Sequence, residues 1–98
     1  MAPAQASFVL ARDHPAFEGH FPGHPIAPAV VILAEVIAVV ESSVPASGAY
    51  DIASAKFLRP VGPGVLLTVR HEQLASGQVR FEVASAEGAV ATGTLAPR

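Results

Sequence analysis

Several features common in proteins are missing from this sequence, and each absence excludes a class of site or partner. There is no cysteine among the 98 residues, which excludes disulfide bonds and thiolate metal sites. Charged residues make up only 14% of the chain, against roughly a quarter in typical globular proteins. The net charge of −2 provides no basic field that would attract nucleic acid.

The chain also lacks an apolar run long enough to cross a membrane. The longest run, residues 29–40, is interrupted by Glu35, whereas a membrane-spanning helix needs roughly 20 apolar residues. Residues 1–7 have neither the basic region nor the apolar core of a signal peptide. We therefore expect a cytoplasmic protein without a membrane span.

Apolar residues are abundant instead, at 51% of a short chain. A domain of this size buries only about two-thirds of the surface that its unfolded chain exposes. A monomer would therefore leave much apolar surface in water, so the composition predicts an oligomer.

The apolar segment from Ala29 to about Ser42 is too long for an ordinary strand. Prolines precede it and Ser-Ser-Val-Pro follows it, which are helix boundary signals, and Pro28 suits the first helical position. Its β-branched residues lower intrinsic helicity, so burial must stabilise it. We predict a helix enclosed on nearly all sides, with a buried strand as the competing interpretation.

Five other segments have the composition of strands bounded by turns, namely residues 7–11, 51–58, 65–74, 78–84 and 89–95. Within the fourth segment Val79, Phe81 and Val83 alternate with polar residues, as expected for a half-buried strand. One strand, a helix and then four strands in a meander predict a single α+β domain over residues 1–98. Its antiparallel sheet would wrap the central helix.

Two features of the chain have the chemistry of a site. His20 and His24 lie on a proline-stiffened loop, but the intervening prolines remove the helical geometry of a metal pair, so we expect no metal site. Glu35 is a carboxyl inside the apolar helix, where such a group is usually paired, hydrogen-bonded or protonated, and a protonated acid can donate a proton. Alternatively, Glu35 reaches water or a dimer seam. His14 and His71 are expected at the surface.

Residues 18–28 (EGHFPGHPIAP), followed by the apolar helix, resemble the signature of the hot-dog-fold 3-hydroxyacyl-acyl-carrier-protein dehydratases. That family includes FabZ, FabA and the ApeI-like dehydratases of aryl-polyene pathways. Residues 56–64 (KFLRPVGPG) resemble its next strand and turn, and the order of elements matches over nearly the whole chain. The resemblance implies a hot-dog fold, an antiparallel sheet of about five strands around a central apolar helix, and a dimer whose sheets run together.

The resemblance also implies a reaction without a cofactor. A 3-hydroxyacyl thioester, linked through phosphopantetheine to acyl carrier protein, would lose water to give the trans-2-enoyl thioester in fatty-acid, aryl-polyene or polyketide-type biosynthesis. His20 matches the residue that removes the α proton, and the Ala29 N–H matches the donor to the thioester carbonyl. The carboxylic acid comes from the other subunit. The residues expected against the substrate are Phe21, Pro22, Gly23, Pro28 and Phe57.

The sequence departs from the family at the catalytic acid. The family's acid lies fourteen residues after the histidine, at Ala34 here, and Glu35 is one residue later, about 100° further round the helix. We interpret Glu35 as the shifted acid. The alternatives are a non-catalytic hot-dog subunit that binds acyl chains or pairs with an active partner, in a homodimer or heterodimer, and a hot-dog thioesterase. Four basic residues are candidates for a rim that contacts the acidic carrier protein, with ordinary solvated surface as the favoured alternative for any one of them: Arg12, Lys56, Arg59 and Arg70.

Overall fold

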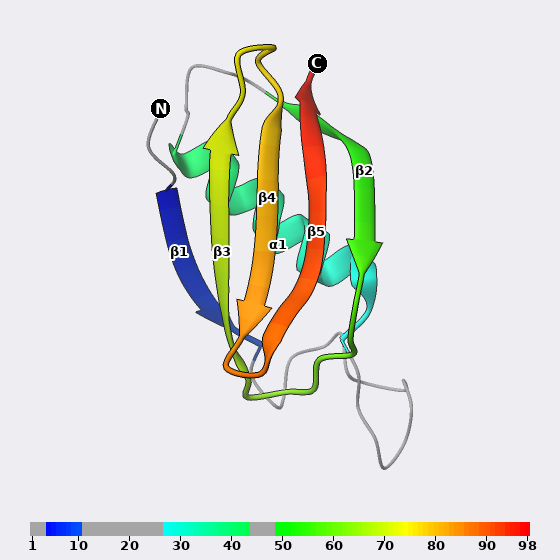
Figure 1. Cartoon of the computed structure of the whole chain (residues 1–98). Coiled ribbons are helices and arrows are strands. Elements are labelled where there is room, and N and C mark those ends of the chain that lie inside the picture. The colour runs from blue at the N-terminus through cyan, green and yellow to red at the C-terminus, as the bar shows by residue number, and fades with distance from the viewer. Residues whose placement is uncertain (1–3, 11–26, 44–48) are drawn as a thin grey trace.

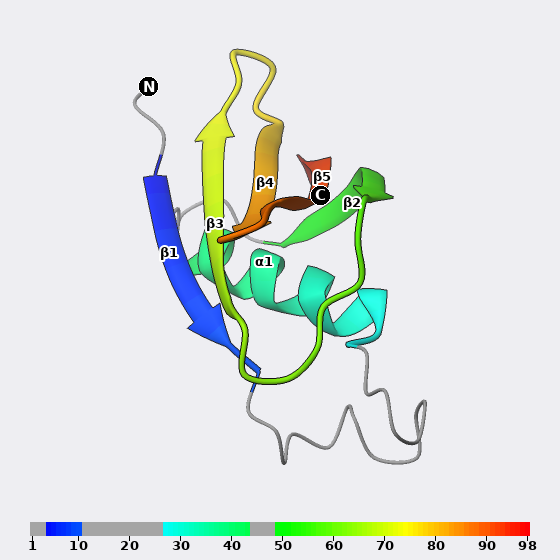
Figure 2. The same ribbon diagram turned by 60° about the horizontal axis from the view of Figure 1, so that its bottom comes forward.

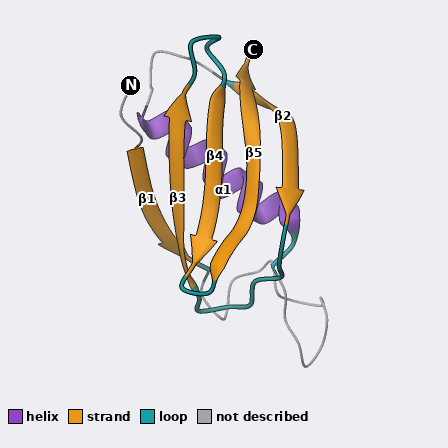
Figure 3. Ribbon diagram, in the orientation of Figure 1, coloured by secondary structure: helices purple, strands orange, loops and turns teal. Residues whose placement is uncertain are grey.

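The computed structural model describes residues 4–10, 27–43 and 49–98, and these form one antiparallel sheet with one helix packed across a face of it (Figure 1). This is the predicted α+β architecture. The strands are β1 (Ala4–Val9), β2 (Tyr50–Phe57), β3 (Leu66–Gln73), β4 (Val79–Ser85) and β5 (Gly88–Pro97), and the helix is α1 (Ala29–Ser43). Figure 3 shows the helix running diagonally behind the five strands.

The strand order is β1-β3-β4-β5-β2, with every neighbouring pair antiparallel. The prediction of a four-strand meander was therefore wrong for β2, because only β3, β4 and β5 follow one another in space. β2 pairs with β5 at the edge of the sheet, and the connection formed by residues 58–65 leads from it to β3. Because β4 and β5 lie between β2 and β3 in the sheet, this connection crosses the end of the sheet and cannot close a tight hairpin. It contains Pro60 and Pro63, which suit an extended loop.

The helix begins at Ala29, where the predicted apolar segment starts, and Pro28 precedes it instead of being its first residue. The Pro28 carbonyl accepts hydrogen bonds from the N–H groups of Val31 at 3.0 Å and Ile32 at 3.4 Å, so Pro28 caps the helix. The side chains that face the sheet are spaced four residues apart and are buried: Ile32, Val36 and Val40.

The opposite face of α1 is open, so the prediction of a helix enclosed on nearly all sides was wrong for a single chain. Val30 is 71% exposed, and Ala34 and Ala38 are also exposed. The physical reason is that one chain supplies a sheet on only one side of the helix, as Figure 2 shows. The helix is also too short to cross a membrane, and no other helix occurs in the described ranges.

The core lies between α1 and the inward-facing residues of the central strands. These residues recur at every second position, as a pleated sheet requires, and include Leu67, Val69, Val79, Phe81, Val83 and Leu95. The alternation predicted for residues 78–84 is confirmed. The two hairpin turns also occur where the sequence placed them, with positive φ at Gly77 and Gly88.

Candidate functional site

A pocket of about 350 Å³ lies at the N-terminal end of α1. The start of the helix contributes Ala27, Ala29 and Ile32, and residues 57–61 contribute the other wall. A backbone hydrogen bond from the Ala27 N–H to the Val61 carbonyl, 2.7 Å long, holds the two walls together. The pocket thus joins two segments that the sequence analysis selected separately.

The walls of this pocket combine an apolar surface with a polar end. The side chains of Ile32, Phe57 and Leu58 are apolar, while Ala29 belongs to the first helical turn. N–H groups in a first turn have no acceptor within the helix, and the helix dipole adds positive potential there. No acidic residue in that turn opposes the potential. The arrangement suits an apolar chain bearing an oxygen on which negative charge develops.

The structure brings together some of the predicted site residues. Ala29 and Phe57 line the same pocket, and Pro28 is adjacent to Ala29 as the helix cap. The predicted base His20 and three predicted substrate contacts, Phe21, Pro22 and Gly23, lie outside the described residues.

Glu35 is half-buried on the flank of α1 and does not line the pocket with Ala29. Ala34, at the position that corresponds to the family's acid, lies on the exposed face together with Val30 and Ala38. Glu41, near the helix end, is exposed. In a single chain, therefore, the carboxyl of Glu35 and the N-terminal pocket are separate.

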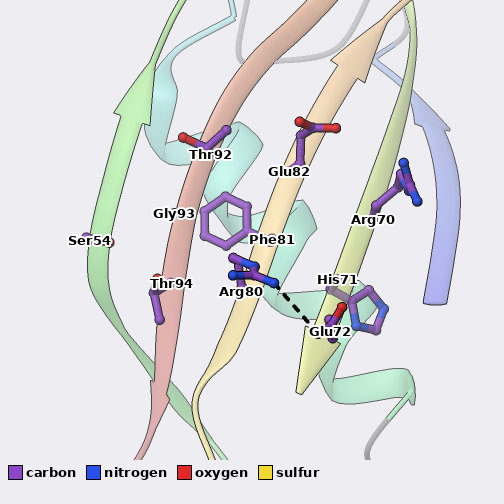
Figure 4. Close-up of a pocket in the computed structure, with 10 residues that line it drawn as sticks. All are labelled: Ser54, Arg70, His71, Glu72, Arg80, Phe81, Glu82, Thr92, Gly93 and Thr94. Carbon is purple, nitrogen blue, oxygen red and sulfur yellow. Dashed lines mark ion pairs between the residues drawn. The ribbon is translucent and has the colours of Figure 1, made fainter. Parts of the chain in front are cut away.

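A second cavity, of about 460 Å³, is an open groove on the sheet face away from the helix (Figure 4). Its outward side chains are largely polar, and Arg80 forms an ion pair with Glu72 at 3.7 Å. Thr92 and Thr94 form part of its floor. Although it is larger, this groove lies on the opposite side of the sheet from α1, and none of the predicted site residues within the described ranges lines it. Ala29 and Phe57 line the pocket at the start of the helix, which is therefore the candidate site.

Of the four candidates for a basic rim, the three that the structure describes do not lie together. Arg59 lines the candidate pocket, whereas Arg70 lines the groove on the outer face. Lys56 pairs with Thr92, which also lines the outer groove, and Arg12 lies outside the described residues. Arg70 and the neighbour of Lys56 thus belong to the outer face of the sheet, away from Arg59, so these three residues do not form one rim around the pocket.

The prediction that His71 lies at the surface was also wrong. His71 is 6% exposed, and this burial lowers the pKa of its imidazole from the ordinary value of 6.5. Its Nε2 lies 3.4 Å from the Ser43 hydroxyl at the end of α1. The alternation of Leu67, Val69 and His71 along β3 is the sequence signal that could have identified it as inward-facing. The described residues contain no cluster of three His, Cys, Asp or Glu side chains suited to a metal ion.

The family model described as ApeI-like, ApeI dehydratase, matches residues 2–94. A curated relative, the 3-hydroxyacyl-[acyl-carrier-protein] dehydratase FabZ of Syntrophotalea carbinolica, is 43% identical over 79 residues, covering 70% of this chain and 53% of the relative. The chain thus spans about half the length of the curated relatives it matches.

Solved structures share the fold at lower sequence identity. The dehydratase heterocomplex ApeI:P from Xenorhabdus doucetiae aligns with a TM-score of 0.82 and 21% identity, over 98% of this chain and 88% of that chain. The (R)-hydratase from A. caviae involved in PHA biosynthesis aligns with a TM-score of 0.74 and 16% identity, over 96% and 91%. At these identities the likeness establishes the hot-dog fold.

Proposed function

The chain belongs to the ApeI-like dehydratase family, and we propose that it removes water from a 3-hydroxyacyl thioester carried on acyl carrier protein. The product is the trans-2-enoyl thioester, and the reaction needs no cofactor. The observation that carries this proposal is the family match over residues 2–94. The pocket at the start of α1 supports it, because the pocket combines apolar walls with backbone N–H groups.

The proposed mechanism divides the acid–base work between two side chains. The His20 imidazole removes a proton from the carbon next to the thioester carbonyl, and the Ala29 N–H stabilises the negative charge that develops on the carbonyl oxygen. Glu35 then gives its proton to the hydroxyl on the next carbon, and the C–O bond breaks to release water. Phe57, with Phe21, Pro22, Gly23 and Pro28, would hold the acyl arm.

The active form that we propose contains two hot-dog subunits, with Glu35 of one subunit serving the site of the other. Two features support this arrangement. One face of α1 is uncovered and carries Val30, Ala34 and Ala38. In addition, β2 forms an edge of the sheet in a single chain. An unpaired edge and an apolar helix face are both unfavourable in water, so a second subunit would stabilise the chain.

Intact mass spectrometry of 3-hydroxyacyl-carrier protein tests the proposed reaction. With the wild type, the acylated carrier protein is expected to lose the mass of one water molecule. Both His20→Ala and Glu35→Gln are expected to lower the rate of this dehydration at least about 100-fold. Glu41→Gln is the matched control, because Glu41 is exposed on the same helix and is expected to retain full activity. Full activity of Glu35→Gln would contradict the assignment of the acid, and loss of the whole acyl group would indicate a thioesterase.

A second candidate function is a non-catalytic subunit that binds acyl chains or pairs with an active dehydratase. The observation that favours it is Ala34, since the corresponding position in the family holds the acid and this alanine lies on the uncovered helix face. This candidate predicts that the purified chain binds acyl-carrier protein without turnover. It also predicts that activity appears only when a second hot-dog protein supplies a carboxylic acid.

A further inference from the structure

Arg59 is held in a fixed place beside the start of the helix. The preceding residue, Leu58, donates its N–H to the Val90 carbonyl of β5 at 2.8 Å. Two residues after Arg59, the Val61 carbonyl accepts the Ala27 N–H at 2.7 Å, and Pro60 between them restricts the backbone. The backbone on either side of Arg59 is therefore hydrogen-bonded to β5 and to the entrance of the helix.

Arg59 is the single charged residue among the described residues that line the pocket. Its guanidinium lies over the β4–β5 turn, where Nη2 is 3.5 Å from the place that a Cβ on Gly88 would occupy. Glu87 on that turn forms an ion pair with it at 3.7 Å. The Glu87 side chain is 83% exposed, and exposed ion pairs of this kind contribute little stability. A phosphate group can therefore compete with Glu87 for the Arg59 guanidinium.

We propose that Arg59 binds the phosphodiester of the phosphopantetheine arm at the mouth of this pocket. The inference rests on the proposed function, because that substrate carries its acyl group on such an arm. A guanidinium presents a planar fork of donors that matches two phosphate oxygens, and charge-assisted bonds of this type are among the stronger ones. The positive end of the α1 dipole lies at the same pocket and favours the same charge.

The other described cations have different surroundings. Arg70 and Arg80 line the groove on the outer face of the sheet, where Arg80 is paired with Glu72. Lys56 lies opposite Thr92 in the strand register, and Thr92 also lines that groove. Arg98 forms a 2.7 Å ion pair with Asp51. Arg59 thus differs from these residues in lining the apolar pocket where the acyl arm is proposed to bind.

Three thioesters of one 3-hydroxyacyl group test this assignment: the carrier-protein ester, the free phosphopantetheine ester, and the N-acetylcysteamine ester, which has no phosphate. Arg59→Gln is expected to raise KM about 10- to 100-fold for the first two, with kcat nearly unchanged. KM for the third is expected to change less than about twofold, because no phosphate is present. Arg59→Lys should give an intermediate KM, and Arg80→Gln is the matched control without effect.

Several results would overturn the assignment. An equal rise in KM for all three esters would mean that Arg59 supports the pocket structure, and a rise for the carrier-protein ester alone would mean that it contacts carrier carboxylates. Glu87→Gln removes the competing anion and is expected to lower KM for the phosphate-bearing esters about two- to threefold, so a rise would also contradict the proposal. A wild type that dehydrates none of the esters would refute the proposed function. Equilibrium binding of phosphopantetheine against pantetheine, in wild type and Arg59→Gln, would still test Arg59.

Discussion

The Phe81 ring on β4 packs against Gly93 on β5, so closely that a Cβ at residue 93 would lie 2.7 Å from the Phe81 Cζ. The Ser54 carbonyl oxygen of β2 approaches the same position. Because both neighbours are held in the sheet, Gly93→Ala is expected to lower the free energy of unfolding by about 1–3 kcal/mol or more. Urea denaturation of the purified variant measures the change.

A second substitution distinguishes the contribution of the Phe81 ring to this destabilisation from that of the Ser54 carbonyl. Phe81→Leu in the Gly93→Ala background removes the aromatic edge, so part of the loss should be recovered relative to the sum of the single changes. Thr94→Ala, on the next residue and the outer face, is the control and should change stability by less than about 0.5 kcal/mol. A Gly93→Ala variant as stable as the wild type would contradict the close packing.

Two valines on α1 should respond differently to truncation. Val36 is fully buried against the sheet, so Val36→Ala removes buried methyl groups and leaves a cavity, at an expected cost of about 2 kcal/mol. Val30 is 71% exposed, so Val30→Ala should change stability by less than about 0.5 kcal/mol in the monomer. Denaturation at several protein concentrations checks both values. A cost at Val30 that grows with concentration would show that a second subunit covers this face.

The hydroxyl of Tyr50 should be dispensable for folding. Tyr50 is 4% exposed, and its hydroxyl has no hydrogen-bond partner within the described part of the chain. A buried hydroxyl without a partner costs about 1–3 kcal/mol, so Tyr50→Phe is expected to maintain or raise the free energy of unfolding. Tyr50→Leu, which leaves a cavity, should lower it. A loss of more than about 1 kcal/mol in Tyr50→Phe would show that the hydroxyl is bonded in solution.

The buried imidazole of His71 should make the fold sensitive to acid. Burial lowers its pKa in the folded state below the 6.5 of the unfolded chain, so the unfolded state binds more protons between the two values. The contribution of His71 is therefore complete above about pH 6.5 and declines as the pH falls toward the folded-state pKa. One proton limits the slope to about 1.4 kcal/mol per pH unit.

The His71 effect can be isolated by comparing two pH series of thermal or urea unfolding. His71→Gln removes the titrating group, so the free energy of unfolding should fall less steeply below pH 6.5 than in the wild type. The variant itself is less stable, because its contact with Ser43 is altered. The test is how the difference in free energy of unfolding between wild type and variant changes with pH, because the absolute stabilities differ for other reasons. Parallel curves through this range would contradict a role for His71 in the acid response.

Local patterns in the sequence predicted the elements that depend on short-range periodicity. The apolar run predicted the helix that begins at Ala29, and alternation predicted the buried face of Val79, Phe81 and Val83. The predicted boundaries differ from the observed ones by only a few residues. The Gly-His-Phe-Pro motif and the second block after residue 55 also indicated the family, which the match over residues 2–94 confirmed.

Only the tertiary structure decided which distant segments meet. It placed β2 beside β5, directed His71 inward, and separated Arg59 at the helix pocket from Arg70 on the outer face. These outcomes depend on strand pairing between residues far apart in the chain and on the pleat that sends alternate side chains to opposite faces. The sequence alone determines what each segment prefers to form, whereas the pairing of the segments determines which side chains share a pocket.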